Sequence, residues 1–142
     1  MPCQICDSFN GIELHDSKLV SLRLRREQTR NGADIDNVEL SLKLLRHSRG
    51  TSEYVDAVLI FKDCGALRMD LDLIGKQLCA DDIASALCQS VSAMDATIAE
   101  GRSASRHNDA VGFLHYTITL IPPGGEVHIF ARDYELALVP PQ

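Results

Sequence analysis

The sequence predicts an α+β domain made mainly of antiparallel β-sheet, with about seven strands and one long helix. Two observations lead to this prediction. Several separate runs alternate apolar and polar residues, which is typical of strands with one buried and one solvated face, and such strands belong to antiparallel sheets. One run, 81–100, instead repeats its apolar residues every three or four positions, as a helix does. A β-sandwich with an added helix is the alternative architecture.

Four runs in the first half of the chain predict strands. Residues 20–25, 38–44 and 67–73 alternate in strict order, so each run has one core face, and in 38–44 that face carries Leu42. Residues 54–62 (YVDAVLIFK) are apolar at both odd and even positions. This indicates a central strand that is covered on both sides.

The run at 81–100 predicts the one long helix. Its apolar residues recur at spacings of 4, 4, 3 and 4, which form a single stripe on a helix surface. Asp81 or Asp82 can cap its start and Gly101 can end it. The polar stretch 101–109 is then expected to form a loop. The stripe consists of Ile83, Leu87, Val91, Met94 and Ile98.

The last third of the chain predicts a hairpin. Residues 112–121 and 126–133 flank Pro-Pro-Gly-Gly, in which the prolines cannot donate to a ladder and the glycines accept positive φ. Symmetric pairing about this turn sets Leu120 opposite Val127. Farther on the apolar parity flips, so we expect a bulge or tight turn near Asp133 and a final strand over 134–138.

Two histidines, His115 and His128, fall on the same face of this hairpin. In the symmetric register His128 lies opposite Thr119, four residues along the strand from His115. The two rings then begin roughly 14 Å apart, at about 3.4 Å per residue. We therefore expect two separate surface histidines that share no metal ion.

The composition fits a single domain over residues 1–142. Lys and Arg number 14 against 20 Asp and Glu, and the formal net charge of -6 disfavours nucleic acid as a partner. Residues 72–142 hold 4 basic and 9 acidic side chains, a net charge of -5, so a charged partner would be basic. Five cysteines, an odd number, suggest a reducing compartment. The sequence shows neither a secretory start nor a membrane-spanning run, so we expect a soluble cytoplasmic protein.

The sequence contains few candidates for catalytic or metal-binding motifs. Cys3 and Cys6 have the spacing of half a zinc site, but no second CxxC or HxxxH pair accompanies them. We therefore expect a frayed terminus with two incidental thiols. The chain has no GxSxG, phosphate-loop, GxGxxG or HExxH motif. We expect no catalytic residues, no metal and no cofactor.

The densest acidic stretch lies in the middle of the chain and has two interpretations. Asp70 and Asp72 share one strand face, where like charges repel unless solvent or a cation intervenes. The stretch is either a solvated face or a docking surface for a basic protein, whose value would lie in steering and specificity. Its members are Asp56, Asp63, Asp70, Asp72, Asp81 and Asp82.

The pair His15-Asp16 comes just before the first predicted strand. Histidine-aspartate phosphohydrolases use such a pair for metal binding, but they place it on a helix within a largely helical domain, with further histidines. Here the Asp16 carboxylate can accept a hydrogen bond from the backbone N–H of Lys18, and Ser17 can do the same more weakly. We interpret the pair as a turn, with His15 facing water.

Three segments, LHDSKLVSLRL, VLIFKDCGALRMDLD and GGEVHIFARDYEL, together resemble a known family. They are similar to the small β-rich bacterial proteins grouped as predicted immunity protein 50 and relatives, which commonly begin with H-D-S/A-x-L-x-S before their first strand. The resemblance implies a non-enzymatic protein of a polymorphic-toxin system, which binds and silences a toxin made in the same cell. Only the motif itself carries over, onto His15, Asp16, Ser17 and Leu19.

Three hypotheses for the function therefore remain. The first is an immunity protein that binds and neutralises a cognate bacterial toxin, a protein partner that the acidic second half would fit if the toxin is basic. The second is a small-molecule-binding module or minor enzyme with a pocket between sheet and helix. The third is a structural or oligomer-forming subunit. The sequence does not decide the oligomeric state.

Overall fold

The computed structural model describes residues 3–71, 82–90, 112–121 and 124–140. Within these ranges the chain forms one short helix and one six-stranded sheet in which all neighbouring strands are antiparallel, in the order β1-β2-β3-β6-β5-β4. The elements are α1 (Gln4–Asn10), β1 (Lys18–Gln28), β2 (Asp34–Ser48), β3 (Thr51–Leu71), β4 (Ile83–Ser90), β5 (Leu114–Leu120) and β6 (Gly125–Leu138).

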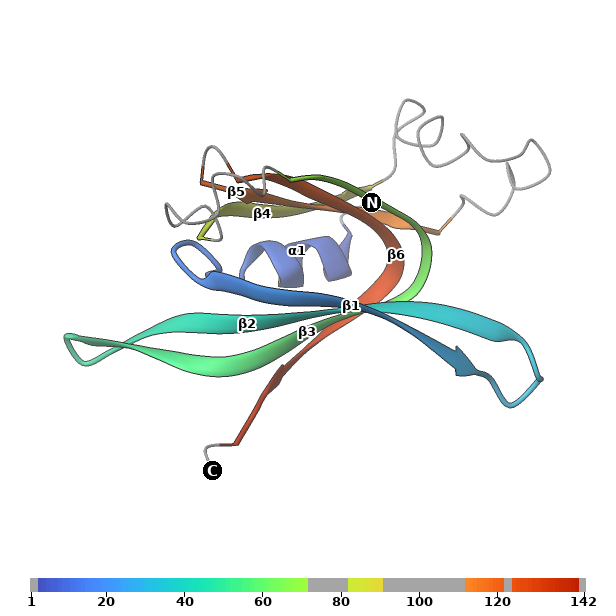
Figure 1. The fold of residues 1–142 in the computed structure, drawn as a ribbon, viewed down its shortest axis with the longest axis horizontal. Helices are drawn as coiled ribbons and strands as arrows, with labels where there is room; N and C mark the ends of the chain where they lie inside the picture. Colours follow the sequence, from blue (N-terminus) through green and yellow to red (C-terminus); the bar gives the residue numbers. More distant parts are fainter. Residues whose placement is uncertain (1–2, 72–81, 91–111, 122–123, 141–142) are drawn as a thin grey trace.

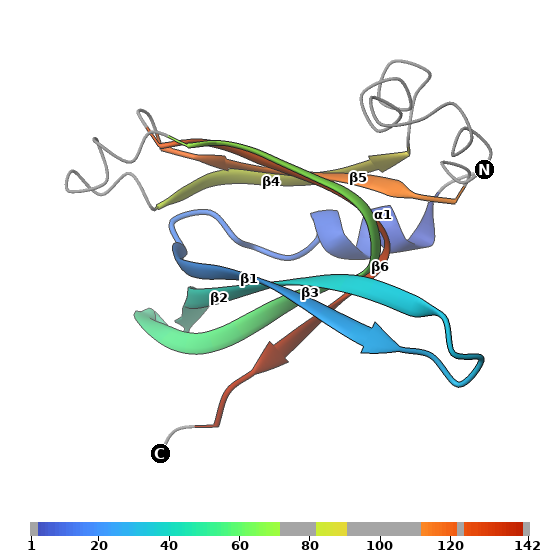
Figure 2. The same cartoon turned by 45° about the vertical axis from the view of Figure 1, so that its right-hand side comes forward.

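The sheet folds over on itself because its two central strands bend. β3 has 21 residues and β6 has 14, and both pass from one layer of the sheet into the other (Figures 1 and 2). The bend in β3 coincides with a register shift between Cys64 and Ala66 and with a positive φ of 55° at Asp63. A bulge of this kind increases local twist and re-aims the strand. β1 and β2 therefore lie in one layer, and β4 and β5 lie in the other.

The edge strands β1 and β4 meet where each of them begins. Lys18 and Asp82 form an isolated antiparallel bridge, and the Lys18 ammonium lies 2.7 Å from the Asp82 carboxylate. The Asp16 N–H donates to the Ile83 carbonyl at 2.9 Å, and the Ile83 N–H donates to the Ser17 carbonyl at 2.7 Å. These bonds join the two layers at one end of the molecule.

The helix α1 lies between the two layers (Figure 2). Phe9 is 1% exposed, and its ring lies 5.0 Å from the ring of Tyr116 and 5.1 Å from that of Tyr134. The Asn10 side chain replaces a missing neighbouring strand for β4: it accepts from the Cys88 N–H at 2.7 Å and donates to the Cys88 carbonyl at 3.0 Å. Burial of an aromatic ring and this paired bond fix the helix in place.

The helix at the amino terminus corrects our expectation of a frayed end. Cys3 caps α1, because its sulfur accepts from the Cys6 N–H at 3.2 Å, and Gly11 ends the helix. Cys6 and Phe9, three residues apart, are both buried. The two buried residues therefore have the three-residue spacing of a helix face. A seven-residue helix contains this spacing only once, so the sequence pattern was too short to predict a helix.

The predicted helix over 81–100 is wrong for the part that the structure describes. Ile83–Ser90 form the strand β4, paired with β5, while residues 91–100 lie outside the described ranges. Ile83 and Cys88 are buried but Leu87 is 47% exposed, which a helical stripe would not allow. A register shift between Ile83 and Ser85 changes which positions face inward. Pairing with β5 thus overrides the helical period.

Within the described residues there are six strands, where we expected about seven in the chain. The run 54–62 and the described part of the run 67–73, residues 67–71, belong to the single strand β3, and the runs 126–133 and 134–138 belong to β6. The parity flip in β6 is present, since Arg132 and Asp133 are both exposed before alternation resumes at Tyr134. The register shift opposite this point lies in β3, at Cys64–Ala66, so the irregularity bends both strands at one place.

The alternation in β2 correctly gives the core face of that strand. Leu42 is 2% exposed and lies opposite Ala57 of β3 on the inner face. We expect Leu42→Ala to lower the free energy of unfolding by about 2–5 kcal/mol, because it removes buried methyl groups and leaves a cavity. Urea denaturation measures this change. The neighbouring Lys43→Ala, on the outer face, is the control and should cost at most about 1 kcal/mol; similar losses for both would contradict the assignment.

Candidate functional site

The β5–β6 hairpin is tighter than we expected, and this changes its register by two residues. Leu120 pairs with Gly125, and Ile118 pairs with Val127. Gly125 has a φ of 102°, and a Cβ built on it would lie 1.8 Å from the Asp70 carbonyl oxygen of β3. Only glycine can pair at this position, because any side chain would collide with the neighbouring backbone. The symmetric pairing of Leu120 with Val127 is therefore wrong.

The corrected register brings two histidines together. His128 lies opposite Thr117, so His115 is its diagonal neighbour on the outer face of the sheet, the face turned away from α1. His115 Nε2 lies 2.8 Å from His128 Nδ1, and the ring centroids are 5.1 Å apart. Our expectation of two separate histidines is wrong, because the hairpin turn sets the register and the turn is shorter than symmetry suggested.

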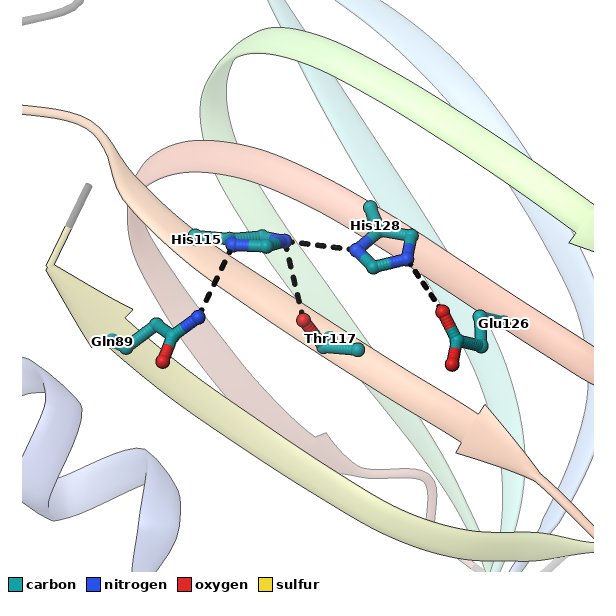
Figure 3. A network of polar contacts seen from close by, with 5 residues as sticks. All are labelled: Gln89, His115, Thr117, Glu126 and His128. Atoms are coloured by element: carbon teal, nitrogen blue, oxygen red, sulfur yellow. Dashed lines mark hydrogen bonds and ion pairs between the residues drawn. The ribbon is translucent and has the colours of Figure 1, made fainter. Parts of the chain in front are cut away.

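A chain of polar contacts extends from this pair across three strands (Figure 3). His128 Nε2 lies 2.8 Å from Glu126 Oε2, while His115 Nε2 lies 3.2 Å from Thr117 Oγ1 and His115 Nδ1 lies 3.4 Å from Gln89 Nε2. We call these five residues the histidine network. It consists of Gln89 on β4, His115 and Thr117 on β5, and Glu126 and His128 on β6.

One arrangement of protons, with one proton on each imidazole, accounts for the contacts of the two rings with Gln89, with each other and with Glu126. The Glu126 carboxylate accepts, so His128 carries its proton on Nε2 and its Nδ1 is an acceptor. His115 then donates from Nε2 to His128, and its Nδ1 accepts from the Gln89 amide. All the hydrogen bonds point in one direction, which is the arrangement that orients an imidazole for proton transfer or for ligation.

The histidine network runs from the interior to the solvent. His115 is 5% exposed and stacks on Phe130, with the ring centroids 4.5 Å apart at an angle of 10°. The His128 side chain is 29% exposed and that of Glu126 is 50% exposed. Within the described ranges, no group of three or more His, Cys, Asp or Glu side chains is arranged to hold a metal ion. Two imidazole nitrogens are thus the only converging ligands of the network.

The acidic residues of the sequence do not gather on a single face. Three of them pair with cations: Asp56 with Lys43, Asp63 with Arg132 at 3.1 Å, and Asp82 with Lys18 at 2.7 Å. Asp70 is exposed on β3, in the layer that carries the histidine network. Asp72 and Asp81 lie outside the described residues.

The motif at the head of β1 connects three strands. Asp16 lies in a turn with a φ of 66°, and its carboxylate is 3.0 Å from Nδ1 of the exposed His15. Ser17 is fully buried, and its hydroxyl accepts from the Leu45 N–H of β2 at 3.0 Å. Leu19 is half-buried against the core. The backbone of Asp16 and Ser17 bonds to Ile83 of β4, so the motif links β1, β2 and β4.

Sequence reasoning also missed a cluster of thiols. Cys6 and Cys88 are both buried, with their sulfur atoms 3.2 Å apart as free thiols, and Cys3 caps the same helix. Burial raises the pKa of Cys6 and of Cys88 above the ordinary thiol value, so both are protonated near neutral pH. Placing Cys88 on a helix had separated it from the amino terminus, and no local signal links residues 82 positions apart.

No protein-family model, curated protein or solved structure matches this chain. Among the described residues, none of the helices has the length and apolar character needed to span a membrane.

The left-handed conformation of Asp16 makes a testable difference between two substitutions. We expect Asp16→Ala to lower the free energy of unfolding by about 1 kcal/mol, because a Cβ-bearing residue without a short polar side chain is strained at this φ. Asp16→Gly should cost only a few tenths of a kcal/mol, because glycine adopts positive φ freely. Urea denaturation compares the two. Equal losses would show that the carboxylate itself, and not the backbone conformation, stabilises the turn.

Buried thiols predict a loss of stability at alkaline pH. Burial raises the pKa of Cys64 from 9.0 to about 12. Above pH 9 the unfolded thiol loses its proton while the folded one keeps it, so the unfolded state is favoured, by up to about 1.4 kcal/mol per pH unit for each such thiol. We expect the free energy of unfolding of the reduced protein to fall between pH 9 and 10. Cys64→Ala should show a shallower decline; an unchanged slope would contradict the prediction.

Proposed function

We propose that this protein is a non-enzymatic interaction protein of the cytoplasm that binds and neutralises a cognate bacterial toxin. The resemblance of the segment around His15, Asp16 and Ser17 to predicted immunity proteins supports the proposal. That segment connects three strands of the fold through the Ser17 hydroxyl and the backbone of Asp16 and Ser17, which supports a structural role for it. The contact surface must then be sought elsewhere.

The observation that carries the proposal is a pair of like charges on the outer face. Asp70 of β3 lies directly opposite Glu126 of β6, and both are exposed. Carboxylates at directly opposed positions of an antiparallel pair destabilise the sheet. A basic side chain of a partner would relieve this repulsion on binding, so the cost to the free protein becomes a source of affinity and specificity.

The outer face of the other layer provides the contrast. There the charged residues pair across strands with opposite sign: Arg23 with Glu39 at 2.9 Å, Lys43 with Asp56, and Lys62 with Glu135 at 2.9 Å. Beside Asp70 and Glu126 on this face, Arg68 of β3 lies opposite His128 of β6. An exposed acidic pair of this kind is suited to contact with a basic protein.

The contact is tested with the toxin domain encoded beside the gene. We expect a stoichiometric complex by size-exclusion chromatography, and a slower association rate for Asp70→Asn. The same substitution should raise the free energy of unfolding by about 0.2–1 kcal/mol, because it removes a like-charge contact. Asp56→Asn is the matched control: it removes a carboxylate that is already paired with Lys43, so it should not slow association. Equal association rates for the two variants, or separate elution of protein and toxin, would refute the proposal.

A groove between α1 and β6 favours the second hypothesis, a small-molecule-binding module. It has a volume of about 420 Å³ and is lined by Gln4, Ile5, Ser8, Ile12, Asp133, Tyr134, Glu135 and Leu136. The helix beside it is α1 and not the one that the sequence predicted. Saturable thermal stabilisation by a metabolite, abolished by a substitution at Ser8, would favour this function over toxin binding.

A further inference from the structure

We propose that His115 and His128 form a binding site for a divalent transition-metal ion, with Ni²⁺, Cu²⁺ and Zn²⁺ as the ions that fit it. The two imidazole nitrogens that face each other, His115 Nε2 and His128 Nδ1, come from adjacent strands and lie 2.8 Å apart. Imidazole nitrogen is a preferred ligand of these ions. The site does not depend on the proposed toxin binding.

The separation of the two nitrogens matches the geometry of a shared ion. Two nitrogens bound side by side at about 2.0 Å on a square-planar Cu²⁺ or Ni²⁺ ion lie about 2.8 Å apart, and on a tetrahedral Zn²⁺ ion they lie about 3.3 Å apart. The first value equals the separation present in the structure, and the second requires an opening of about half an ångström. In the hydrogen-bonded pair the two nitrogens point along the line that joins them, so the rings must turn by about 45° in total at each nitrogen before both lone pairs meet at the ion.

The proton now shared by the two rings is accounted for when the ion binds. His115 changes tautomer: Nε2 gives up its proton and ligates the ion, while Nδ1 takes up a proton and donates it to the Gln89 amide oxygen once that amide turns over. His128 already has Nδ1 as an acceptor and keeps its proton on Nε2. In this exchange one proton moves from Nε2 to Nδ1 of His115, so the number of protons on the pair does not change.

The groups behind the two rings already have the arrangement found around bound metals. A histidine that ligates a metal almost always donates its other ring N–H to a carboxylate, a carbonyl or water. Glu126 lies 2.8 Å from His128 Nε2, and Gln89 lies 3.4 Å from His115 Nδ1. His115, which is 95% buried, is stacked on Phe130. Outer contacts of this kind limit the positions that the two rings can take.

The partly exposed His128 leaves a path for the ion from solvent, and Thr117 Oγ1 lies 3.2 Å from His115 Nε2. Water would fill the remaining positions, as at metal sites with few protein ligands. Among the described residues, the charged neighbours in adjacent strand positions are Glu126, Asp70 opposite it, and Arg68 opposite His128.

The proposal is tested by titrating the reduced, full-length protein with Ni²⁺ and Zn²⁺, with Mg²⁺ as the negative control. Cu²⁺ is left out because it oxidises free thiols. We expect isothermal titration calorimetry to show one equivalent of Ni²⁺ or Zn²⁺ bound, with loss of this binding in His128→Gln. Glu126→Gln should weaken binding 10–100-fold, as the loss of a carboxylate behind a ligating histidine does. Binding of Mg²⁺ with similar affinity would contradict imidazole ligation.

Two control variants exclude other sites on the chain. His47→Gln removes an exposed histidine that contacts Ser52, and Cys3→Ser removes a thiol of the cluster at α1. Neither should change the affinity. Because His128 and Glu126 are partly exposed, their variants should fold, and circular dichroism verifies this. Absence of binding, binding that persists in His128→Gln, or binding that disappears in Cys3→Ser would each overturn the proposal.

Discussion

The pairing of β3 with β6 is the constraint on which the rest of the structure depends. The whole of β6 pairs with residues 57–71 of β3, and the two strands bend together where Cys64 and Ala66 shift register against Ala131 and Phe130. A long strand that is apolar on both sides can bury both halves only by turning from one layer into the other. The bend creates the space between the layers that α1 fills, with Phe9 against Tyr116 and Tyr134.

The bend also reverses which residues of β6 face the core. Val127, Ile129 and Ala131 are fully buried on one side of it, while Tyr134 and Leu136 take the inward positions on the other. The same geometry puts β4 and β5 beyond β6, so that their outer face looks away from α1. His115, His128 and Glu126 lie on that face because their parity in the strands is opposite to that of the core residues.

Strict alternation of apolar and polar residues correctly predicted the buried face of a strand where that strand pairs in one register with one neighbour on each side. The inward face of β2 follows directly from its sequence, because a slip of one residue would turn every leucine outward. The helical interpretation failed for β4, because Leu87, four residues after Ile83, is an exposed apolar side chain and not part of a buried stripe. Sequence patterns failed for α1 as well, because Cys6 reaches Cys88 only through tertiary packing.

For the candidate site, the sequence identified His115 and His128 as residues of interest but did not predict the distance between them. Both histidines were placed on one face of one hairpin, and a two-residue error in register separated them. The decisive residue is Gly125, whose missing side chain lets β6 begin pairing against both Leu120 and the Asp70 carbonyl. The glycine that tightens the turn also sets Glu126 opposite Asp70 and His128 beside His115. The acidic pair and the histidine network therefore share one structural cause, the close approach of β6 to β3 at Gly125. A change in that approach would displace both together.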